Sequence, residues 1–543
     1  MSVWQRATPG QAGDTPPGTA LRQLRAAAQR PLPRWVAASA WMVAGLILFV
    51  CYLRLSRTAV VNSDGAGNAL QAWDMLHGNL LLHGWKLSDV SFYTTELPEY
   101  MLVELVLGVN AGVVHVAAAL TYTVLVLLAA LLAKGKAAGW AGFTRAVFAG
   151  GMMLAPELGD GVYTLLLSPD HVGTGVPVLA AWLILDRARP RWYVPVIIGA
   201  VLAWALVADT LILYIGILPL IIVCAVRACQ GAVQQRRPWS SQWYMLSLAA
   251  AGVAAAAAAT AMADVLSAAG GYQVHPVMGS LADEAALTSH MGIWVETVLV
   301  LFGADFFGQP FRSVTTVEAL FHLAGIVLAA WAVWIAARRF FRDRELVPAL
   351  LVVGLVINLV GFLLSTRVVN VLSAREIAAV LPLGAVLAAR LLSARLAAAR
   401  LMPLLLVVLL GYVVILGQEV IQPAAPASYQ QLADWLVARH FHDGLAGYWD
   451  ASVTTLASHD RVQVSPVCGG AGGRFGQGTW EADTAWYNPA RRYANFLVIG
   501  GPGSCSTPTV AQAKTAFGPP ARTYRVAGYK VLVWRENLLA RLG

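Results

Sequence analysis

Apolar stretches separated by short polar segments run along this chain from residue 35 to about residue 418. Many of these stretches reach the roughly 17 to 25 residues that a membrane-spanning helix needs. Counted under the rule that cytoplasmic loops carry most Lys and Arg, the pattern predicts an all-α polytopic membrane protein with about 11 spans. The expected spans are approximately 35–55, 111–133, 143–161, 171–186, 192–208, 210–226, 242–263, 317–337, 347–366, 376–393 and 401–418.

Basic residues support this arrangement, because every loop expected on the inner side contains them. The segment 1–34 then forms a cytoplasmic tail, and the segment after the first span lies outside the cytoplasm. Ala, Gly and Arg usage suits a high-GC bacterium, so we expect a multi-pass protein of a bacterial plasma membrane. The inner loops contain Lys134, Lys136 and Arg145; Arg187, Arg189 and Arg191; Arg227, Arg236 and Arg237; Arg338, Arg339, Arg342 and Arg344; and Arg390, Arg395 and Arg400.

Composition agrees with this class, since 58% of the residues are hydrophobic and only 12% are charged. The formal net charge of +9 would also suit a nucleic-acid-binding protein. Because the cations lie mainly in short loops between apolar stretches, we interpret them as determinants of membrane orientation. We therefore expect the lipid bilayer as a partner and no nucleic acid.

Three regions expected outside the membrane are too long to be simple turns: 56–110, 264–316 and 419–543. The first two are interpreted as outer loops of a transmembrane domain covering 35–418. The third has the helical periodicity of 429–441 and short β-rich runs at 496–499 and 529–534, which predict a small extracytoplasmic α/β domain. In an oxidising compartment Cys468 and Cys505 of this domain are expected to form a disulfide.

Acidic residues gather on the same expected outer side. The segment 62–69 (NSDGAGNA) places Asp64 just past the first span, and Asp74 and Glu96 follow in the same loop. Ionisable groups at the edge of an apolar layer usually face a cavity, a partner or a substrate path. Asp64 is therefore a candidate catalytic group, and the alternative is a solvated acid that caps the helix beginning near Ala66.

A second acidic group surrounds the third and fourth expected spans: Glu157, Asp160, Asp170 and His171. Oxygen and imidazole ligands of this kind suit a divalent cation such as Mg or Mn. For Asp170 and His171 the alternative is an N-cap for the fourth span. Asp209 interrupts the apolar stretch 192–226, and we expect it to be a structural acid hydrogen-bonded to neighbouring helix ends.

Carboxylates together with an arginine suit the attack of an acceptor hydroxyl on a sugar whose leaving group is a phosphate. A carboxylate takes the acceptor proton, and Arg375 is the candidate that neutralises the departing phosphate. The alternative for Arg375 is an anchor at the headgroup level, or an ion pair with Glu376.

At these residues the chain resembles the GT-C superfamily of membrane glycosyltransferases, which includes the dolichyl-phosphate-mannose protein mannosyltransferases and their bacterial relatives. Residues 64–79 (DGAGNALQAWDMLHGN) resemble the acidic motif of the family, and 373–376 (SARE) resemble its phosphate-contacting segment. The resemblance implies an inverting enzyme with a polyprenyl-phosphate sugar donor, Asp64 as base, Arg375 at the donor phosphate and an acceptor in the cell envelope. Many relatives have Asp-Glu where this chain has Asp64-Gly65, so Glu157, Asp160 and Asp170 are the candidates for a second acid.

Two other functional classes remain open. The sequence lacks a Walker A motif, a G-x-G-x-x-G dinucleotide motif, H-E-x-x-H and G-x-S-x-G, which disfavours ATP-driven transport and soluble-hydrolase chemistry. A transporter or flippase for a lipid-linked or anionic envelope precursor would use the same charges to line a path. A non-catalytic envelope scaffold would depend on its soluble domain instead.

Overall fold

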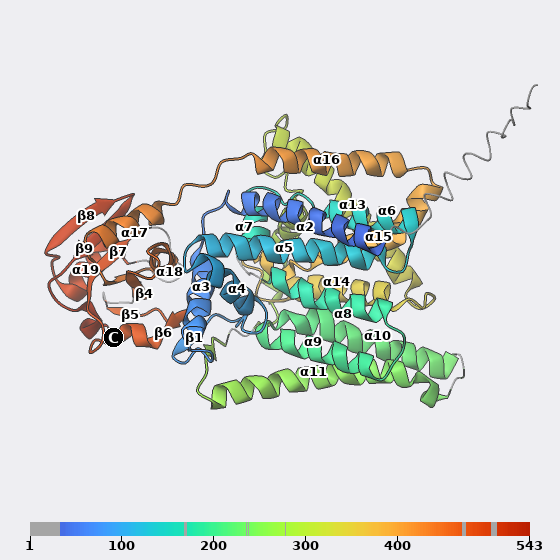
Figure 1. Ribbon diagram of the computed structural model, residues 1–543, viewed down its shortest axis with the longest axis horizontal. Coiled ribbons are helices and arrows are strands. Elements are labelled where there is room, and N and C mark those ends of the chain that lie inside the picture. The colour runs from blue at the N-terminus through green and yellow to red at the C-terminus, as the bar shows by residue number, and fades with distance from the viewer. Residues whose placement is uncertain are drawn as a thin grey trace, which may run out of the picture.

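A bundle of long helices with a smaller α/β domain at one end makes up this protein (Figure 1). The structure is a computed structural model, and it describes residues 33–542, apart from 168–170, 235, 237, 277–278, 470–473 and 501–507. We call the end of the bundle that carries the α/β domain the domain end, and the opposite end the basic end.

Within the described ranges, nine helices are long and apolar enough to cross a membrane, so the chain is a multi-pass membrane protein. These candidate spans are Trp35–Ser56, Gly112–Lys134, Leu213–Gln234, Trp239–Ala268, Glu284–Phe302, Val314–Arg339, Leu346–Leu364, Val380–Ala398 and Met402–Val420. The helices of the bundle are α2 (Arg34–Ser56), α3 (Ser63–Leu76), α4 (Glu96–Leu107), α5 (Gly112–Lys134), α6 (Gly139–Met152), α7 (Asp160–Leu166), α8 (Gly175–Arg187), α9 (Tyr193–Ala208), α10 (Leu218–Cys229), α11 (Trp243–Ala268), α12 (Glu284–Phe302), α13 (Val314–Arg339), α14 (Leu346–Leu364), α15 (Val380–Ala398) and α16 (Met402–Val420).

The structure differs from the expected spans in two respects. The spans expected at 143–161, 171–186 and 192–208 are the shorter helices α6, α8 and α9, with 14, 13 and 16 residues. The expected outer loop 264–316 contains α12, a helix of 19 residues. Polar side chains interrupt its apolar pattern in the sequence. Trp294 Nε1 donates to the Leu359 carbonyl at 3.1 Å, so α12 lies across the domain end of α14.

The loops predicted to be cytoplasmic gather at the basic end. Arg390 of α15 pairs with Asp186 of α8 at 2.8 Å, and its Nε donates to the Leu132 carbonyl of α5 at 2.9 Å. The Arg227 guanidinium lies over the Phe340 ring, 5.3 Å from its centroid. These contacts form two groups, one joining α5, α8 and α15 and the other joining α10 to the residue after α13, and the side assigned to each of these segments is self-consistent. The compartment that this end faces remains a prediction.

The C-terminal domain is built on a mixed sheet of six strands in the order β5-β4-β3-β7-β9-β8. Strands β4, β3 and β7 are parallel, and β9 and β8 continue the sheet antiparallel. An α/β domain was predicted here, and the expected helix and both expected β-rich runs are present. The elements are α17 (Ser428–Ala438), β3 (Asp443–Ala446), α18 (Tyr448–Ala457), β4 (Gln463–Gly469), β5 (Phe475–Gln477), β6 (Ala482–Asp483), β7 (Ala494–Ile499), α19 (Val510–Phe517), β8 (Arg522–Val526) and β9 (Tyr529–Val533).

A second, three-stranded sheet joins this domain to the bundle. Strand β1 (Trp85–Leu87) pairs parallel with β2 (Gln273–Val274) and antiparallel with β6. Trp85 is 2% exposed, donates from Nε1 to Asp74 at 2.8 Å and packs edge-on against Trp486, with ring centroids 5.1 Å apart. The same hydrophobic core contains residues of α3, α4 and the C-terminal domain.

Replacing Trp85 by Ala should loosen this joint, because it removes a buried ring and one of the hydrogen bonds that Asp74 accepts. We expect a loss of about 3–5 kcal/mol in the free energy of unfolding and faster limited proteolysis between the bundle and the C-terminal domain. The matched control is Trp192→Ala, since Trp192 is 75% exposed and should be replaced with little effect. Equal stability of the two variants would contradict this role of Trp85.

Candidate functional site

Asp64 lies in the first turn of α3, at the domain end of the bundle. The side chain of Asn62 accepts a hydrogen bond from Gly65 N at 2.9 Å and therefore caps the helix. Asn62 Nδ2 also donates to the Tyr163 hydroxyl at 2.9 Å, which ties the start of α3 to α7. The capping role considered for Asp64 thus belongs to Asn62, and the Asp64 carboxylate is available for other contacts.

Tyr448 reaches Asp64 from the C-terminal domain. Its hydroxyl donates a hydrogen bond to Asp64 Oδ1, and it lies 3.0 Å from Glu481 Oε2. Tyr448 and Glu481 are 4% and 2% exposed. One hydroxyl proton serves one acceptor at a time, so both contacts become hydrogen bonds only when one carboxyl group carries a proton that it donates to Tyr448. Burial, and then the two carboxylates, raise the pKa of Tyr448 well above its ordinary value.

The backbone around this contact is shaped for it. Ser63 Oγ donates to the Tyr448 carbonyl at 2.6 Å, which fixes the start of α18 against α3. A Cβ at Gly67 would collide with the Glu481 carboxylate, so α3 needs a glycine there. Glu481 itself has φ +49°, a left-handed conformation that is uncommon outside glycine. Asp64, Tyr448 and Glu481 therefore form one cluster, which we call the Asp64 cluster.

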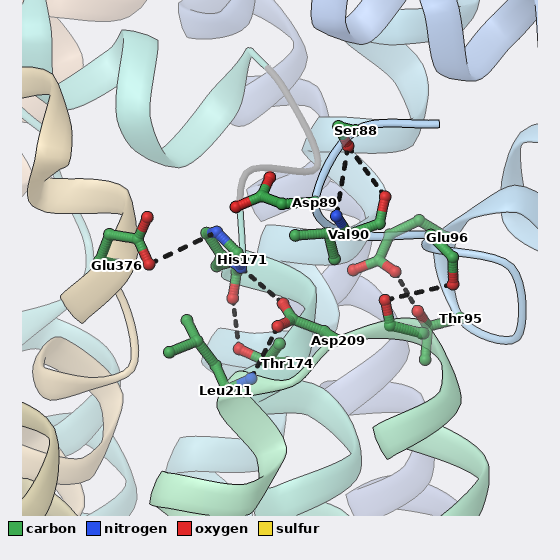
Figure 2. Close-up of polar contacts among 12 residues, drawn as sticks. Ser88, Asp89, Val90, Thr95, Glu96, His171, Thr174, Asp209, Leu211 and Glu376 are labelled. Atoms are coloured by element: carbon green, nitrogen blue, oxygen red, sulfur yellow. Dashed lines mark hydrogen bonds and ion pairs between the residues drawn. The ribbon is translucent and has the colours of Figure 1, made fainter. Parts of the chain in front are cut away.

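A second polar group, which we call the His171 network, lies among the loops at the domain end (Figure 2). His171 Nδ1 is 2.6 Å from Asp209 Oδ2, and both side chains are buried. His171 Nε2 lies 3.8 Å from Glu376 Oε2. Asp209 Oδ1 also accepts from Leu211 N at 2.8 Å, so it holds the start of the next helix, in line with the structural role expected for it.

Arg367 extends the His171 network to the first outer segment. Its guanidinium pairs with Asp89 and lies 3.3 Å from Glu376 Oε1. Arg375 precedes Glu376 in the short helix η5 (Val371–Ile377), and its charge acts on both Asp89 and His171. Two arginines from the connection between α14 and α15 thus lie among the carboxylates.

The network shifts the pKa of its members in the direction of charge pairing. Burial opposes a charged His171, but the carboxylates of Asp209 and Glu376 outweigh it and raise its pKa to about 9. Burial also disfavours a charged Asp89, yet the Arg367 guanidinium holds the pKa of that carboxyl below its usual value. Glu96 is different, because burial, reinforced by Asp209 and Glu99, raises its pKa to about 8.

Leu167 lies against α3, and His171 belongs to the second group. A Cβ at Gly65 would be 3.6 Å from the Leu167 carbonyl, so residue 167 contacts α3, and His171 four residues later belongs to the network. Asp170 lies in the intervening stretch and outside the described residues. Residues only four positions apart in sequence, Leu167 and His171, thus contact α3 and the His171 network respectively.

The other predicted acids lie apart from Asp64. Glu157, in the loop before α7, is close to Asp160 and Asp305, and burial together with these acids raises its pKa to about 8. Asp74 accepts from Trp85 Nε1 and from Asn79 Nδ2 at 2.6 Å, which is a structural arrangement. Glu96 is 3% exposed, bonds to Thr95 and belongs with the His171 network through its charge.

The predicted metal and disulfide sites are only partly described. Among the described residues, no three His, Cys, Asp or Glu side chains come together in a way that could hold a metal ion. Cys468 is disulfide-bonded, and Cys505, its expected partner, lies outside the described residues.

Sequence reasoning missed the residues that the fold brings to these two groups. Tyr448 and Glu481 belong to the C-terminal domain, where no motif marked them. Asp89 lies in a loop with no acidic neighbour in sequence. The unusual density of charge in otherwise apolar surroundings was the available signal, and it does not identify partners.

Replacing His171 by Gln should change the pH dependence of stability. The folded pKa of about 9 exceeds the ordinary value of about 6.5, so the stabilisation is complete below pH 6.5 and is lost as the pH rises through 9. We expect the free energy of unfolding of the full-length protein, measured by thermal unfolding in detergent, to decline over this pH window. The decline should be smaller in His171→Gln, by on the order of 2 kcal/mol. Exposed His77→Gln is the control and should follow the wild-type profile, whereas an unchanged profile in His171→Gln would argue against the network.

No protein-family model and no curated protein matches the sequence. Among solved structures, the oligosaccharyltransferase of Archaeoglobus fulgidus in its apo form is 11% identical, with a TM-score of 0.48 over 86% of this chain and 69% of its own. ArnT from Cupriavidus metallidurans in the apo state is 15% identical, with a TM-score of 0.45. The match covers 93% of this chain and 99% of the ArnT chain. The structure of the same protein bound to undecaprenyl phosphate is 12% identical, with a TM-score of 0.37. The match covers 94% of this chain and 100% of the ArnT chain.

Proposed function

We propose that this protein is an inverting membrane glycosyltransferase of the GT-C type. It transfers a sugar from a polyprenyl-phosphate donor to an acceptor of the cell envelope, on the outer face of a bacterial plasma membrane. The domain end is then the outer end, and the C-terminal domain is extracytoplasmic. The donor class and the acceptor follow from the sequence resemblance, and the chemistry follows from the residues at the domain end.

The observation that supports this function most directly is the Asp64 cluster. A carboxylate sits at the ends of apolar helices, with a buried tyrosine hydroxyl and a second carboxylate beside it. A nearby like charge makes proton uptake by a carboxylate pair more favourable, which is what a general base requires. Glu481 therefore replaces Glu157, Asp160 and Asp170 as our candidate for the second acid.

In the proposed reaction the acceptor hydroxyl oxygen attacks the anomeric carbon of the donor sugar. The bond between that carbon and the phosphate oxygen breaks, and the phosphate leaves with the electron pair. Asp64 takes the acceptor proton, and Tyr448 orients its carboxylate through Oδ1. An inverted configuration follows, because the acceptor enters on the face opposite the leaving group.

The departing phosphate needs positive charge on the face of the sugar opposite the base. Arg375 is our candidate for this contact, with Arg367 eight residues earlier on the same connection. Arg367 is already held by Asp89 and Glu376, so it is fixed in position before a donor binds. A preorganised guanidinium stabilises developing phosphate charge without reorganisation at the moment of reaction.

A divalent cation was expected from Glu157, Asp160, Asp170 and His171. His171 is instead engaged with Asp209, and the described side chains do not converge into a three-ligand set. Asp170, one of the four expected ligands, lies outside the described residues, so the metal ion stays an expectation and we route no step through it.

Asp64→Asn should abolish transfer while preserving the fold, because Asn keeps the shape of Asp but cannot accept the proton. We expect a loss of about 10²- to 10⁴-fold in sugar transfer from radiolabelled polyprenyl-phosphate sugars in membranes. Asp283→Asn is the matched control, since Asp283 caps α12 at the surface and Asn can cap equally well. Transfer retained by a folded Asp64→Asn protein would refute the proposal, and no transfer from any donor would favour transport or scaffolding.

Tyr448→Phe and Glu481→Gln test the contribution of the C-terminal domain. Each removes one partner of the Asp64 cluster and leaves Asp64 itself intact. We expect kcat to fall by roughly tenfold or more in each variant with little change in the KM for donor, as for a group that orients the base. Tyr493→Phe, on the exposed side of the same domain, should keep wild-type kcat. A rise in KM alone would instead indicate a role in binding.

A further inference from the structure

A pocket of about 560 Å³ opens at the basic end, far from the Asp64 cluster and the His171 network. Its volume lies within the usual range for ligand sites, about 300–1,000 Å³. It collects side chains from the connection between α5 and α6, from α6, from the ends of α8 and α15, and from the start of α14. Its lining contains Lys136, Arg145, Asp186, Arg344, Glu345 and Arg390, with Ala137, Leu185, Leu346 and Val347 as apolar wall.

Arg390 and Asp186 form a rigid part of this wall. Their ion pair of 2.8 Å is held in place by the bond from Arg390 Nε to the Leu132 carbonyl. Gly135 has φ +54°, and a Cβ there would come within 2.6 Å of Arg390 Nη2, so the chain turns closely over the pair. Arg390 is 9% exposed, and Asp186 largely neutralises its charge.

The remaining cations lack such a partner. Lys136, Arg145 and Arg344 make no ion pair with any residue in the described part of the chain. The lining contains four cationic and two acidic side chains, which leaves an excess of two positive charges. Like charges are drawn together here from three segments, and a bound anion would offset their repulsion.

This pocket is separate from the Asp64 cluster. Helix α5 starts beside α3, where Val114 lies against Gly65, and ends at Lys134 next to the pocket. At about 1.5 Å per residue the intervening helix spans roughly 30 Å, the thickness of a bilayer core. The two sites therefore lie at opposite faces of the membrane.

The surroundings point to a lipid as the source of the anion. Trp140, Phe143 and Val147 form an exposed apolar stripe on α6, being 70%, 54% and 42% exposed. Trp140 and Phe143 have ring centroids 5.2 Å apart, as expected of aromatic anchors at the membrane interface. Arg145 lies on the other side of this short helix and lines the pocket. The pocket is thus at the depth where phospholipid headgroups lie.

We propose that this pocket binds the phosphate-bearing headgroup of an anionic membrane lipid with two negative charges. Arg145, Arg344 and Lys136 contact the phosphate oxygens, and the Arg390–Asp186 pair shapes the floor. Basic pockets between helix ends recognise such headgroups in other membrane proteins. This inference does not depend on the proposed transfer activity.

The test uses the full-length protein, delipidated in neutral detergent, and native mass spectrometry. Cardiolipin, which carries two phosphates, is compared with phosphatidylcholine and with inorganic pyrophosphate. We expect retention of one cardiolipin in preference to phosphatidylcholine. The double variant Arg145→Gln/Arg344→Gln should bind cardiolipin about thirtyfold more weakly, given the usual contribution of one surface cation to anionic lipid binding.

The matched control is Arg189→Gln/Arg191→Gln, which removes two exposed cations from a neighbouring loop outside the pocket. It should keep cardiolipin binding within about threefold of wild type. Equal weakening in both double variants would overturn the pocket in favour of diffuse surface charge. Pyrophosphate binding as tight as cardiolipin would overturn the lipid source, and a lack of preference for cardiolipin over phosphatidylcholine would overturn the charge argument. Unchanged melting temperatures of both variants ensure that binding, not folding, is compared.

Discussion

The three residues of β1 hold together parts of the chain that are far apart in sequence. Their backbone groups are shared between β2 and β6, so the first outer segment, the connection before α12 and the C-terminal domain are aligned along one small sheet. Trp85 adds a buried ring to this joint and a hydrogen bond to α3. Because the register of β6 is fixed in this way, the residue just before it, Glu481, lies against α3. The position of Glu481 in the Asp64 cluster depends on that alignment.

Several buried ionic groups at the domain end meet an opposite charge or a proton donor. His171 pairs with Asp209 and Glu376, and Arg367 pairs with Asp89 and lies close to Glu376. The Tyr448 hydroxyl donates a hydrogen bond to Asp64. A buried charge without such a partner would cost several kcal/mol. The result is a rigid polar layer on top of apolar helices, in which the position of one group constrains the next.

The parts that were predictable from sequence are those with a local cause. Apolar length identified most long helices, and short β-rich runs identified strands of the C-terminal domain around Phe496 and Val531. Helix α12 was missed because Glu284, His290 and Glu296 interrupt its apolar pattern, although a helix buries or exposes such residues by face. Asn62, Ser63 and Asp64 are all good N-cap residues, and only the structure distinguishes among them. The partners of Asp64 were beyond prediction, since they depend on how two domains dock.

Tyr448 and Asp64 are 384 residues apart, and this separation has a consequence for biosynthesis. At about 5–20 residues per second, a ribosome needs roughly 20–80 s to travel from one to the other. Throughout that interval the start of α3 is already made, while the surface that covers it does not yet exist. A chain that stalls or is cleaved before residue 448 carries Asp64 without its hydroxyl partner. The Asp64 cluster can therefore form only after the C-terminal domain has been synthesised.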